Sequence, residues 1–333
     1  MSAASMPAEW ERHEATWLSW PHNARDWPGK FAAIPFVYAE IVRRVSAGEK
    51  VRLLVGDSTQ ETAARRVLKR AGVSLSGVEL LRVPTDRVWT RDSGPLFVRR
   101  GREKCIAHFR FNAWAKYPDY KRDARIPERA AKLLGVPLLD AASVVMEGGA
   151  IDVNGQGMLL ATEECLLDAA VQVRNPGFSR ADYERVFAQM LGVREVVWLG
   201  RGIAGDDTHG HVDDLARFVG PRTVVLCEEK NPADENYRPL NENRERLQNR
   251  LEVVPLPMPS PMVFNGQRLP ASYANFYICN AAVLVPVFDD PRDRIALGIL
   301  AELFRDRPVI GIGCRDFVWG LGTLHCCSQQ EPA

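Results

Sequence analysis

Two neighbouring cysteines near the end of the chain are the first candidates for chemistry. Cys326 and Cys327 follow His325, on a stretch that also holds Gly320 and Gly322. A thiol on a glycine-rich turn is accessible enough to react, and the neighbouring imidazole of His325 can favour its thiolate. Because a free cysteine has a pKa of about 8.5, a nucleophile here needs help from its surroundings or from a cationic substrate. The alternative is that both cysteines are small hydrophobic residues buried in a C-terminal strand.

The densest polar segment, residues 206–214, carries six titratable side chains within nine residues. If residues 208–213 are extended, His209, His211 and Asp213 share one face, because side chains alternate along a strand. If the segment starts a helix, the pairings differ, and the sequence leaves both open. A plain surface loop rarely combines histidine and aspartate at this density, so the segment is a candidate functional site.

Two chemistries could use this segment. The first is metal binding: the pattern His209-x-His211-x-Asp213 resembles the ligands of binuclear zinc hydrolases, and imidazole with carboxylate suits zinc. Hydrolases of that type need further histidines, and His325 is the one remaining histidine that stands in a polar motif. The second is acid–base chemistry beside a thiol, in which a histidine moves protons while an aspartate orients it or binds a cationic substrate.

Two further carboxylates stand next to glycines. Asp92 follows an apolar approach and precedes the turn at Gly94, and Glu147 directly precedes Gly148 and Gly149. A carboxylate at the end of a strand can accept two parallel hydrogen bonds from a guanidinium, and glycine lets a backbone or a ligand come close. The alternative for both acids is that they cap a loop or turn.

The elements that must position these residues alternate along the chain. Apolar runs typical of strands occur at 51–55, 158–161, 196–199, 223–227, 283–287 and 309–312. Patterns typical of helices occur near 33–47, 59–71, 124–134, 179–191, 241–250 and 292–304. This alternation predicts an α/β fold. Asn154-Gly155 predicts a two-residue antiparallel hairpin, and runs 95–99 and 105–110 predict another, so we expect mixed sheets.

Composition excludes several classes of protein. The chain has 333 residues, 46% of them hydrophobic and 26% charged, with a net charge of +1, so we expect no nucleic-acid or membrane partner. It has no apolar run long enough for a membrane span, no signal-peptide pattern at its start and no glycine motif for a nucleotide cofactor. Seven cysteines without paired spacing favour reduced thiols in a cytoplasm. We expect one domain over residues 1–333, and a homo-oligomer remains compatible with the sequence.

Taken together, a series of segments in order along the chain resembles the agmatine deiminase family, which includes the bacterial peptidylarginine deiminases. The segments cover residues 7–21, 89–95, 111–114, 147–149, 162–167, 210–213, 275–277, 288–291 and 325–330. The resemblance implies the pentein fold, a five-bladed α/β propeller of repeated ββαβ units around a central site. It also implies a site without metal or cofactor.

The resemblance assigns four catalytic roles. Cys326 matches the nucleophile, His211 the general acid and base, and Asp92 and Asp213 the two carboxylates that hold a guanidinium. The implied reaction is hydrolytic deimination of a small guanidino substrate through a covalent amidino-thioether on Cys326. Agmatine would give N-carbamoylputrescine and ammonia.

The resemblance also assigns substrate-binding positions. Trp89, Glu147 and Trp114 belong to motifs that line the pocket, and Asp207 matches an acid that can meet the distal amine of agmatine. Peptidyl-arginine or free arginine is the alternative substrate, but the acid-rich pair Asp206 and Asp207 disfavours a substrate that carries a carboxylate.

Some positions depart from the family pattern. Leu321 stands where a glycine is usual, Ala115 and Lys116 replace two glycines and a lysine, Ala281 replaces a glycine, and Cys327 replaces a bulky apolar residue. These changes can reshape the pocket. A zinc hydrolase that uses His209, His211 and Asp213, or a pentein that only binds partners, are the remaining alternatives.

Overall fold

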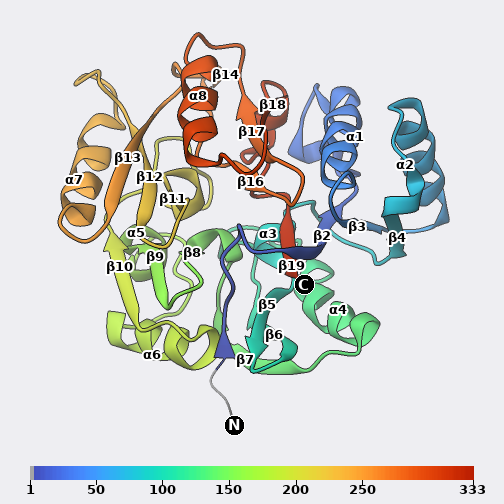
Figure 1. The fold of residues 1–333 in the computed structure, drawn as a ribbon, viewed down its shortest axis with the longest axis horizontal. Helices are drawn as coiled ribbons and strands as arrows, with labels where there is room; N and C mark the ends of the chain where they lie inside the picture. Colours follow the sequence, from blue (N-terminus) through green and yellow to red (C-terminus); the bar gives the residue numbers. More distant parts are fainter. Residues whose placement is uncertain (1–3) are drawn as a thin grey trace.

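Strands and helices alternate along the described chain in the computed structural model (Figure 1). The structure describes residues 4–333. Residues 1–3 lie outside the described residues. They are the start of the predicted domain and of the segment predicted to lack a signal peptide. The α/β prediction is confirmed. The predicted strand runs form β3 (Lys50–Val55), β9 (Met158–Thr162), β10 (Glu195–Leu199), β12 (Thr223–Glu228), β17 (Val283–Val287) and β18 (Val309–Gly313). The predicted helices form α1 (Ile34–Val45), α2 (Ser58–Arg70), α4 (Ile126–Leu134), α6 (Arg180–Leu191), α7 (Tyr237–Leu247) and α8 (Asp293–Leu303).

Local signals explain where several helices begin and end. Ser179 caps α6, because its side chain accepts from the Asp182 N–H while the Asp182 carboxylate accepts from the backbone of Ser179. Helix α6 ends before Gly192 and α4 before Gly135, and both glycines adopt the left-handed conformation that closes a helix.

Five sheets in the described part of the chain share one pattern, an antiparallel pair followed by a parallel pair, so the prediction of mixed sheets is confirmed. In one of them β8 (Ile151–Val153) runs antiparallel to β9, and β9 runs parallel to β10. The pattern recurs in β5–β6–β7, β11–β12–β13, β16–β17–β18 and β19–β2–β3. The strands not yet bounded are β1 (Ala4–Ser5), β2 (His13–Ser19), β4 (Val78–Arg82), β5 (Leu96–Arg100), β6 (Glu103–Arg110), β7 (Leu138–Val145), β11 (Ala216–Phe218), β13 (Glu252–Pro257), β14 (Val263–Phe264), β15 (Gln267–Arg268), β16 (Tyr277–Ile278) and β19 (Gln329–Pro332).

The hairpin predicted at Asn154-Gly155 is confirmed in its direction, but its loop is longer than expected. The loop spans residues 154–157, between β8 and β9. The side-chain oxygen of Asn154 accepts from the backbone N–H groups of Gln156 and Met158, which stabilises a four-residue loop instead of a two-residue turn.

Strand β19, at the C-terminal end of the chain, lies beside β2, from the N-terminal part, in one sheet (Figure 1). Gln329 stands opposite Trp17, and the Trp17 indole donates to the Glu331 carboxylate over 2.8 Å. Strands β3 and β4 extend this sheet in parallel. Because Cys326 directly precedes β19, this pairing fixes the backbone that carries the thiol, and the sequence patterns did not predict it.

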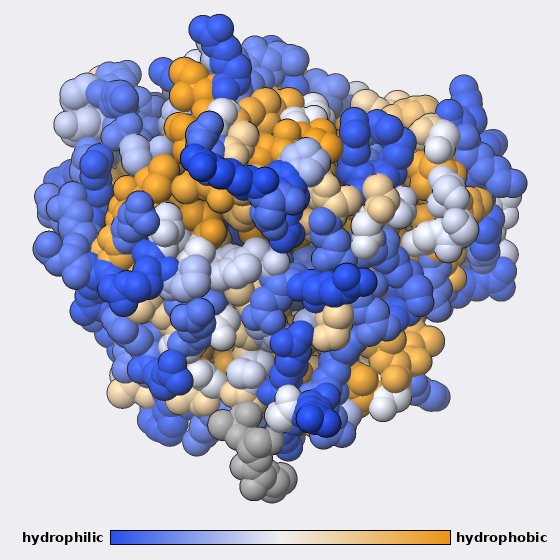
Figure 2. Space-filling view, viewed as in Figure 1, coloured by the Kyte–Doolittle hydropathy of each residue, from blue (hydrophilic) through white to orange (hydrophobic). Residues whose placement is uncertain are grey.

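The core divides into three clusters of buried side chains, of which the largest contains Trp27, Trp89 and Phe317. Hydrophilic residues dominate the face shown in Figure 2, and Leu133 and Ile295 are among the exposed hydrophobic side chains. Among residues 4–333, no helix has the length and apolar character that crossing a membrane requires.

Candidate active site

A pocket of about 410 Å³ opens onto the end of the chain that carries the paired cysteines. Its lining includes five residues that the resemblance places in the site: Trp89, Asp92, Trp114, Asp207 and Cys326. His211, Asp213 and Glu147 are completely buried directly beneath this lining. The structure therefore brings the predicted residues together from positions that lie more than 200 residues apart.

Each of the five repeated sheets is preceded by a residue of the site. Asp92 lies just before β5, Glu147 before β8, Asp213 before β11, Asn275 before β16 and Cys326 before β19. Short helical turns hold several of them, namely α3 (Thr90–Ser93) and the 3₁₀-helices η5 (Gly148–Ala150) and η6 (Val212–Asp214). The same position in every repeat thus contributes one polar group.

Cys326 presents its thiol at the pocket floor, 6% exposed. Its Sγ lies 3.0 Å from Asn275 Nδ2 and 3.8 Å from Asp213 Oδ2. Burial raises the pKa of the Cys326 thiol well above its usual value, and the carboxylates of Asp213, Asp214 and Asp92 raise it further. A cation bound among these carboxylates would therefore favour the thiolate.

His325 does not face the thiol of Cys326, so the direct help to the thiolate expected from sequence is wrong. Its Nδ1 lies 2.6 Å from Asp213 Oδ2 and its Nε2 2.8 Å from Glu9 Oε2. The imidazole acts on Asp213 instead of on sulfur.

Cys327 packs inside the protein and takes no part in the pocket. It is completely buried, and its Sγ donates to the Leu324 carbonyl over 3.4 Å. Burial raises the pKa of its thiol to about 12. Of the two adjacent cysteines, one is therefore a structural residue and the other a candidate nucleophile.

Asp92 is held by two donors that leave its carboxylate facing the pocket. Trp114 Nε1 donates to Oδ2 over 2.9 Å, and the Gly149 N–H donates to Oδ1 over 2.9 Å. Burial raises the pKa of Asp92 to about 6, and the nearby carboxylates of Asp213 and Glu147 add to the rise while His211 opposes it. Because only the ionised form can pair with a guanidinium, substrate binding should weaken as the pH falls through about 6.

His211 stands completely buried among three carboxylates. Its Nδ1 lies 3.7 Å from Asp92 Oδ1 and 3.9 Å from Asp213 Oδ1, and its Nε2 lies 3.8 Å from Glu147 Oε2. Neither ring nitrogen has a hydrogen-bond partner among the described residues, so both are free for a substrate or water. Burial alone would lower the pKa of His211, but the carboxylate of Asp92 and the neighbouring Cys165 and Glu147 side chains raise it well above the usual value. The ring therefore holds a proton to deliver at neutral pH.

Glu147 does not border the pocket, contrary to the expectation that it lines it. Both of its oxygens accept from Arg174 Nε, at 3.1 and 3.3 Å. Burial would raise the pKa of Glu147, but Arg174 and His211 together lower it to about 2. The permanent negative charge of Glu147 thus sits behind His211 and favours its protonated ring. No sequence signal pointed to Arg174. Asn275 lies in the segment 275–277 that resembles the family, but no role was assigned to it.

Asp207 reaches the pocket, but its charge is already partnered. Tyr117 donates its hydroxyl to Oδ2 over 2.7 Å, and Lys116 Nζ contacts Oδ1. The neighbouring Asp206 faces away, because its carboxylate accepts from backbone N–H groups including those of Gly210 and His211. The expectation that this acid-rich pair faces the substrate is therefore wrong for Asp206. For Asp207 it is weakened, because the carboxylate already has a cationic partner.

His209 points away from the site, which removes the geometry of the zinc alternative. Its Nε2 lies 2.8 Å from Asp168 Oδ2, and its backbone φ is 65°, so residues 208–211 form a turn that leads into the 3₁₀-helix η6. The clusters of potential metal ligands found within residues 4–333 contain His211 or Asp213, each without His209. The extended alternative, in which these three residues would share one face, is not formed, because His209 and Gly210 have positive φ angles.

Leu321 keeps a backbone conformation that glycine would adopt without strain. Its φ is 67° and its ψ is 26°, and it lines the pocket beside Gly322. A non-glycine residue pays roughly 1–2 kcal/mol for this conformation. Ala115 also has a positive φ, of 53°. Ala281 instead packs against Gly48, outside the pocket lining. Leu321 therefore adds a side chain to the wall of the pocket, while its backbone has a conformation that glycine would also adopt.

A methyl group at Gly149 would stand inside the catalytic cluster. Its Cβ would lie 2.6 Å from His211 Nδ1, 2.8 Å from Asp92 Oδ1 and 3.1 Å from Asp213 Oδ2. We expect Gly149→Ala to lower kcat/KM by about 100-fold or more, because displacing reacting groups by about 1 Å has effects of this size. Steady-state kinetics would show this, with Gly298→Ala as control because space is open at that site. Unchanged activity in Gly149→Ala would contradict the geometry.

Comparisons with known proteins agree with this arrangement. The family model described as Porphyromonas-type peptidyl-arginine deiminase matches residues 5–332. The agmatine deiminase of Ectopseudomonas mendocina is 32% identical over 98% of this chain and 95% of that protein. Among solved structures, an agmatine deiminase of C. jejuni with substrate bound is 29% identical with a TM-score of 0.90, and that of Enterococcus faecalis is 28% identical with a TM-score of 0.91; each comparison covers 99% of this chain and 96% of the other. Their α/β fold matches the mixed sheets seen here. The chain belongs to the family of Porphyromonas-type peptidyl-arginine deiminases.

Proposed function

We propose that this protein is a hydrolase that removes one nitrogen of a guanidino substrate as ammonia, with agmatine as the first candidate and N-carbamoylputrescine as its product. One observation carries the proposal. Within the described residues, the Cys326 thiol and the Asp92 carboxylate line one pocket, and the Asp213 carboxylate and the unpartnered ring of His211 lie directly beneath that lining. The names of the relatives support agmatine as substrate.

The proposed reaction begins with electrostatics. A guanidinium is always charged and is stabilised by resonance, so it needs a strong nucleophile and a fixed orientation. Asp92 and Asp213 would hold its plane with its carbon over Cys326 Sγ. The bound cation offsets the effect of burial and of the carboxylates on the thiol, which loses its proton to solvent.

Two displacement steps follow. The thiolate adds to the guanidinium carbon, and the S–C bond forms. His211 gives its proton to the departing nitrogen, so that the C–N bond breaks and ammonia leaves an amidino-thioether on Cys326. The neutral His211 then takes a proton from water, whose oxygen adds to the same carbon. The C–S bond breaks, the thiolate returns, one proton passes to solvent and the ureido product leaves.

The test is ammonia release by the purified protein from agmatine, free arginine and a blocked arginyl peptide. Release from agmatine at the highest kcat/KM would support the proposal. Release from arginine or the peptide alone would move the proposal to those substrates. No release from any of them by folded protein would contradict guanidino deimination.

Arginine derivatives are a second candidate because of the charges at the pocket mouth. Arg25 and Arg87 line the pocket, where a substrate carboxylate could meet them. Both arginines already pair with Asp119, at 3.3 and 3.1 Å. Arg87 also pairs with Asp26 over 2.6 Å. A carboxylate would have to compete with these acids, which is why agmatine remains the first candidate.

Lys116 should reduce the affinity for agmatine, because it occupies the acid that would receive the distal amine. We expect Lys116→Met to lower the KM for agmatine by about 5-fold with kcat unchanged, since a half-exposed pair such as Lys116–Asp207 is worth at most about 1 kcal/mol. The measurement is a KM comparison with Lys121→Met, the same substitution at an exposed position nearby. A raised KM in Lys116→Met would show that this lysine helps binding, against the prediction.

We also propose that residues 1–333 form one catalytic unit, a five-bladed propeller of the pentein type. The support is the five-fold repeat of an antiparallel and a parallel strand pair, each preceded by a site residue. The seven cysteines are all free, which supports a reducing compartment such as the cytoplasm. The proposed partner is the small guanidino substrate alone, without nucleic acid, membrane or cofactor.

A further inference from the structure

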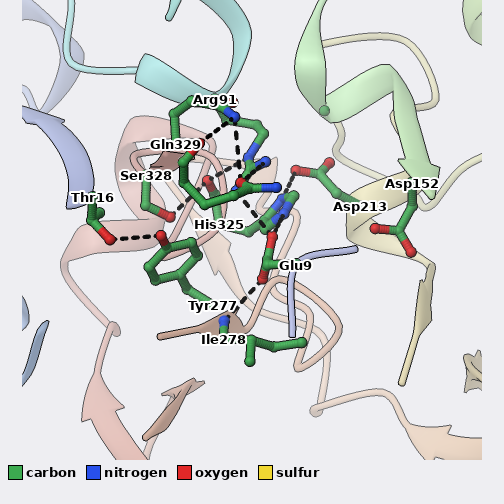
Figure 3. A network of polar contacts seen from close by, with 12 residues as sticks. Glu9, Thr16, Arg91, Asp152, Asp213, Tyr277, Ile278, His325, Ser328 and Gln329 are labelled. Carbon is green, nitrogen blue, oxygen red and sulfur yellow. Dashed lines mark hydrogen bonds and ion pairs between the residues drawn. The ribbon is translucent and has the colours of Figure 1, made fainter. Parts of the chain in front are cut away.

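Glu9, from the segment between β1 and β2, places a buried carboxylate behind the site (Figure 3). Its Oε2 accepts from His325 Nε2 over 2.8 Å and from Arg91 Nη2 over 3.1 Å. Its Oε1 accepts from the Ile278 N–H over 2.9 Å and lies 2.9 Å from Arg217 Nη2. Three hydrogen-bond donors and one ion-pair contact, from four distant parts of the chain, thus hold one side chain that does not border the pocket.

His325 lies between two carboxylates, and each of its ring nitrogens contacts one of them. Nε2 faces Glu9 Oε2, and Nδ1 faces Asp213 Oδ2 over 2.6 Å. An ionised carboxylate only accepts hydrogen bonds, so both ring nitrogens must donate. Burial would raise the pKa of Glu9, but Arg217, His325 and Arg91 lower it well below its usual value. Burial likewise opposes ionisation of Asp213, yet His325 lowers the pKa of that carboxyl too.

The two oxygens of Asp213 consequently have different surroundings. Oδ2 is held by the His325 ring. Oδ1 is buried without a hydrogen-bond partner among the described residues and lies 3.9 Å from His211 Nδ1. An unpartnered carboxylate oxygen in the interior is costly unless a ligand completes it. One oxygen of Asp213 is thereby fixed, and the other is left for the substrate.

We infer that Glu9 and His325 form with Asp213 a buried carboxylate–imidazolium–carboxylate chain that keeps Asp213 ionised and aims its free Oδ1 at the substrate cation. His325 is a positioning residue in this chain, and Glu9 positions His325. The inference rests on the proposed function, because it assigns Asp213 to the guanidinium.

Other charged groups surround this chain and are unchanged by substitution of His325. Arg91 Nε donates to the His325 carbonyl over 3.4 Å, and Arg217 Nε pairs with Asp152 over 3.1 Å. Asp214, next to Asp213, accepts from Asn275 Nδ2 over 2.8 Å. On the pocket side, Asp213 faces His211 and the Cys326 thiol. Of these groups, the neutral Cys326 thiol also donates to Asp213 Oδ2, over 3.8 Å, but none brings a cation to that oxygen, so His325→Gln removes the cation in direct contact with it.

The experiment compares the pH dependence of kcat/KM for agmatine in wild type and in His325→Gln. In the wild type we expect one proton to govern the acid limb, from Asp92 with its pKa of about 6. In the variant Asp213 loses its cationic partner, so its pKa rises and it titrates together with Asp92. The acid limb should move up by about one pH unit and steepen from one proton to two, with kcat/KM about 100-fold lower at pH 7.

Glu331→Gln is the matched control for a second variant, Glu9→Gln. Glu331, on β19, is also buried and pairs with Arg52 Nε over 2.8 Å, but it does not line the pocket. We expect Glu9→Gln to move the acid limb in the same direction as His325→Gln, and Glu331→Gln to leave it in place. Circular dichroism on all variants identifies those that fold.

A second readout separates this inference from the proposed function. The rate at which 2-chloroacetamidine alkylates Cys326 also depends on how Asp213 and Asp92 hold a small cation, and it needs no turnover. If wild type is alkylated but does not release ammonia from agmatine, the proposed substrate fails while the pH shift can still be measured. The inference would be overturned if His325→Gln folds but the acid limb of its alkylation rate stays at the wild-type pH. An equal shift of the acid limb in Glu331→Gln would also overturn it.

Discussion

Replacing Cys326 with alanine is expected to abolish ammonia release from agmatine, with a loss in kcat on the order of 10⁵-fold. The thiol is the one group of the pocket floor that can form a covalent bond to the guanidinium carbon, since Asp92 and Asp213 are needed as anions that hold the cation. Water attacks a resonance-stabilised guanidinium too slowly to replace it. The measurement is initial-rate ammonia release with a coupled assay.

Cys327→Ser is the matched control for this prediction. Cys327 adjoins Cys326 in sequence, is fully buried and turns its sulfur to the Leu324 carbonyl, so its loss should leave kcat and KM close to those of the wild type. Intact-mass spectrometry of wild type quenched during turnover should show the amidino-thioether, and Cys326→Ala should show no adduct. Retained turnover in Cys326→Ala would refute the proposed mechanism.

Replacing His211 with glutamine is expected to lower kcat by about 10³-fold, within the range known for general acid–base groups. The protonated ring gives ammonia its proton, and the neutral ring activates water, so both displacement steps slow down. Asp92 and Asp213 keep their hold on the substrate, and we therefore expect KM to change by much less than kcat. Because the ring acts in the second step as well, the covalent intermediate should persist in quenched samples of the variant.

His209→Gln is the control, two residues away in the same segment. The His209 ring is bound to Asp168 outside the pocket, so this change should leave kcat and its pH profile unchanged. The pair of variants also addresses the zinc alternative, in which both histidines would be ligands and both changes would be equally damaging. A large loss in His209→Gln would contradict the geometry described for the loop.

The repeated elements could be predicted from sequence because each is a local pattern. The apolar runs that became β9, β10 and β12 and the capped pattern of α6 depend on neighbours within a few residues. The sheet that joins β19 to β2 could not be found this way, because it pairs residues from the two ends of the chain. The repetition of units was implied by the family resemblance alone, since it lies in strand order and direction and no repeat is evident in the sequence.

The proposed catalytic residues Cys326, His211, Asp92 and Asp213 were identified from motifs that resemble the family, because nucleophile, base and carboxylate chemistry restrict the residue type. Their neighbours were harder to assign. Glu147 lies in a recognised motif, but it interacts with His211 and does not border the pocket. Arg174, which donates to Glu147, lies in no such motif. A buried ion pair needs only a complementary charge at the right distance, so many sequences fit and no pattern marks them.

By itself, the sequence determined the α/β class, the reactive residue types and the family, because these follow from local periodicity and from motifs that chemistry restricts. Tertiary structure alone decided how charge is distributed around them. His325, adjacent to Cys326 in the chain, acts on Asp213 and Glu9, and Asp207, the expected receptor of a distal amine, is paired with Lys116. The physical reason is that electrostatic interaction depends on distance and burial in space, and the fold sets both through contacts between residues far apart in sequence.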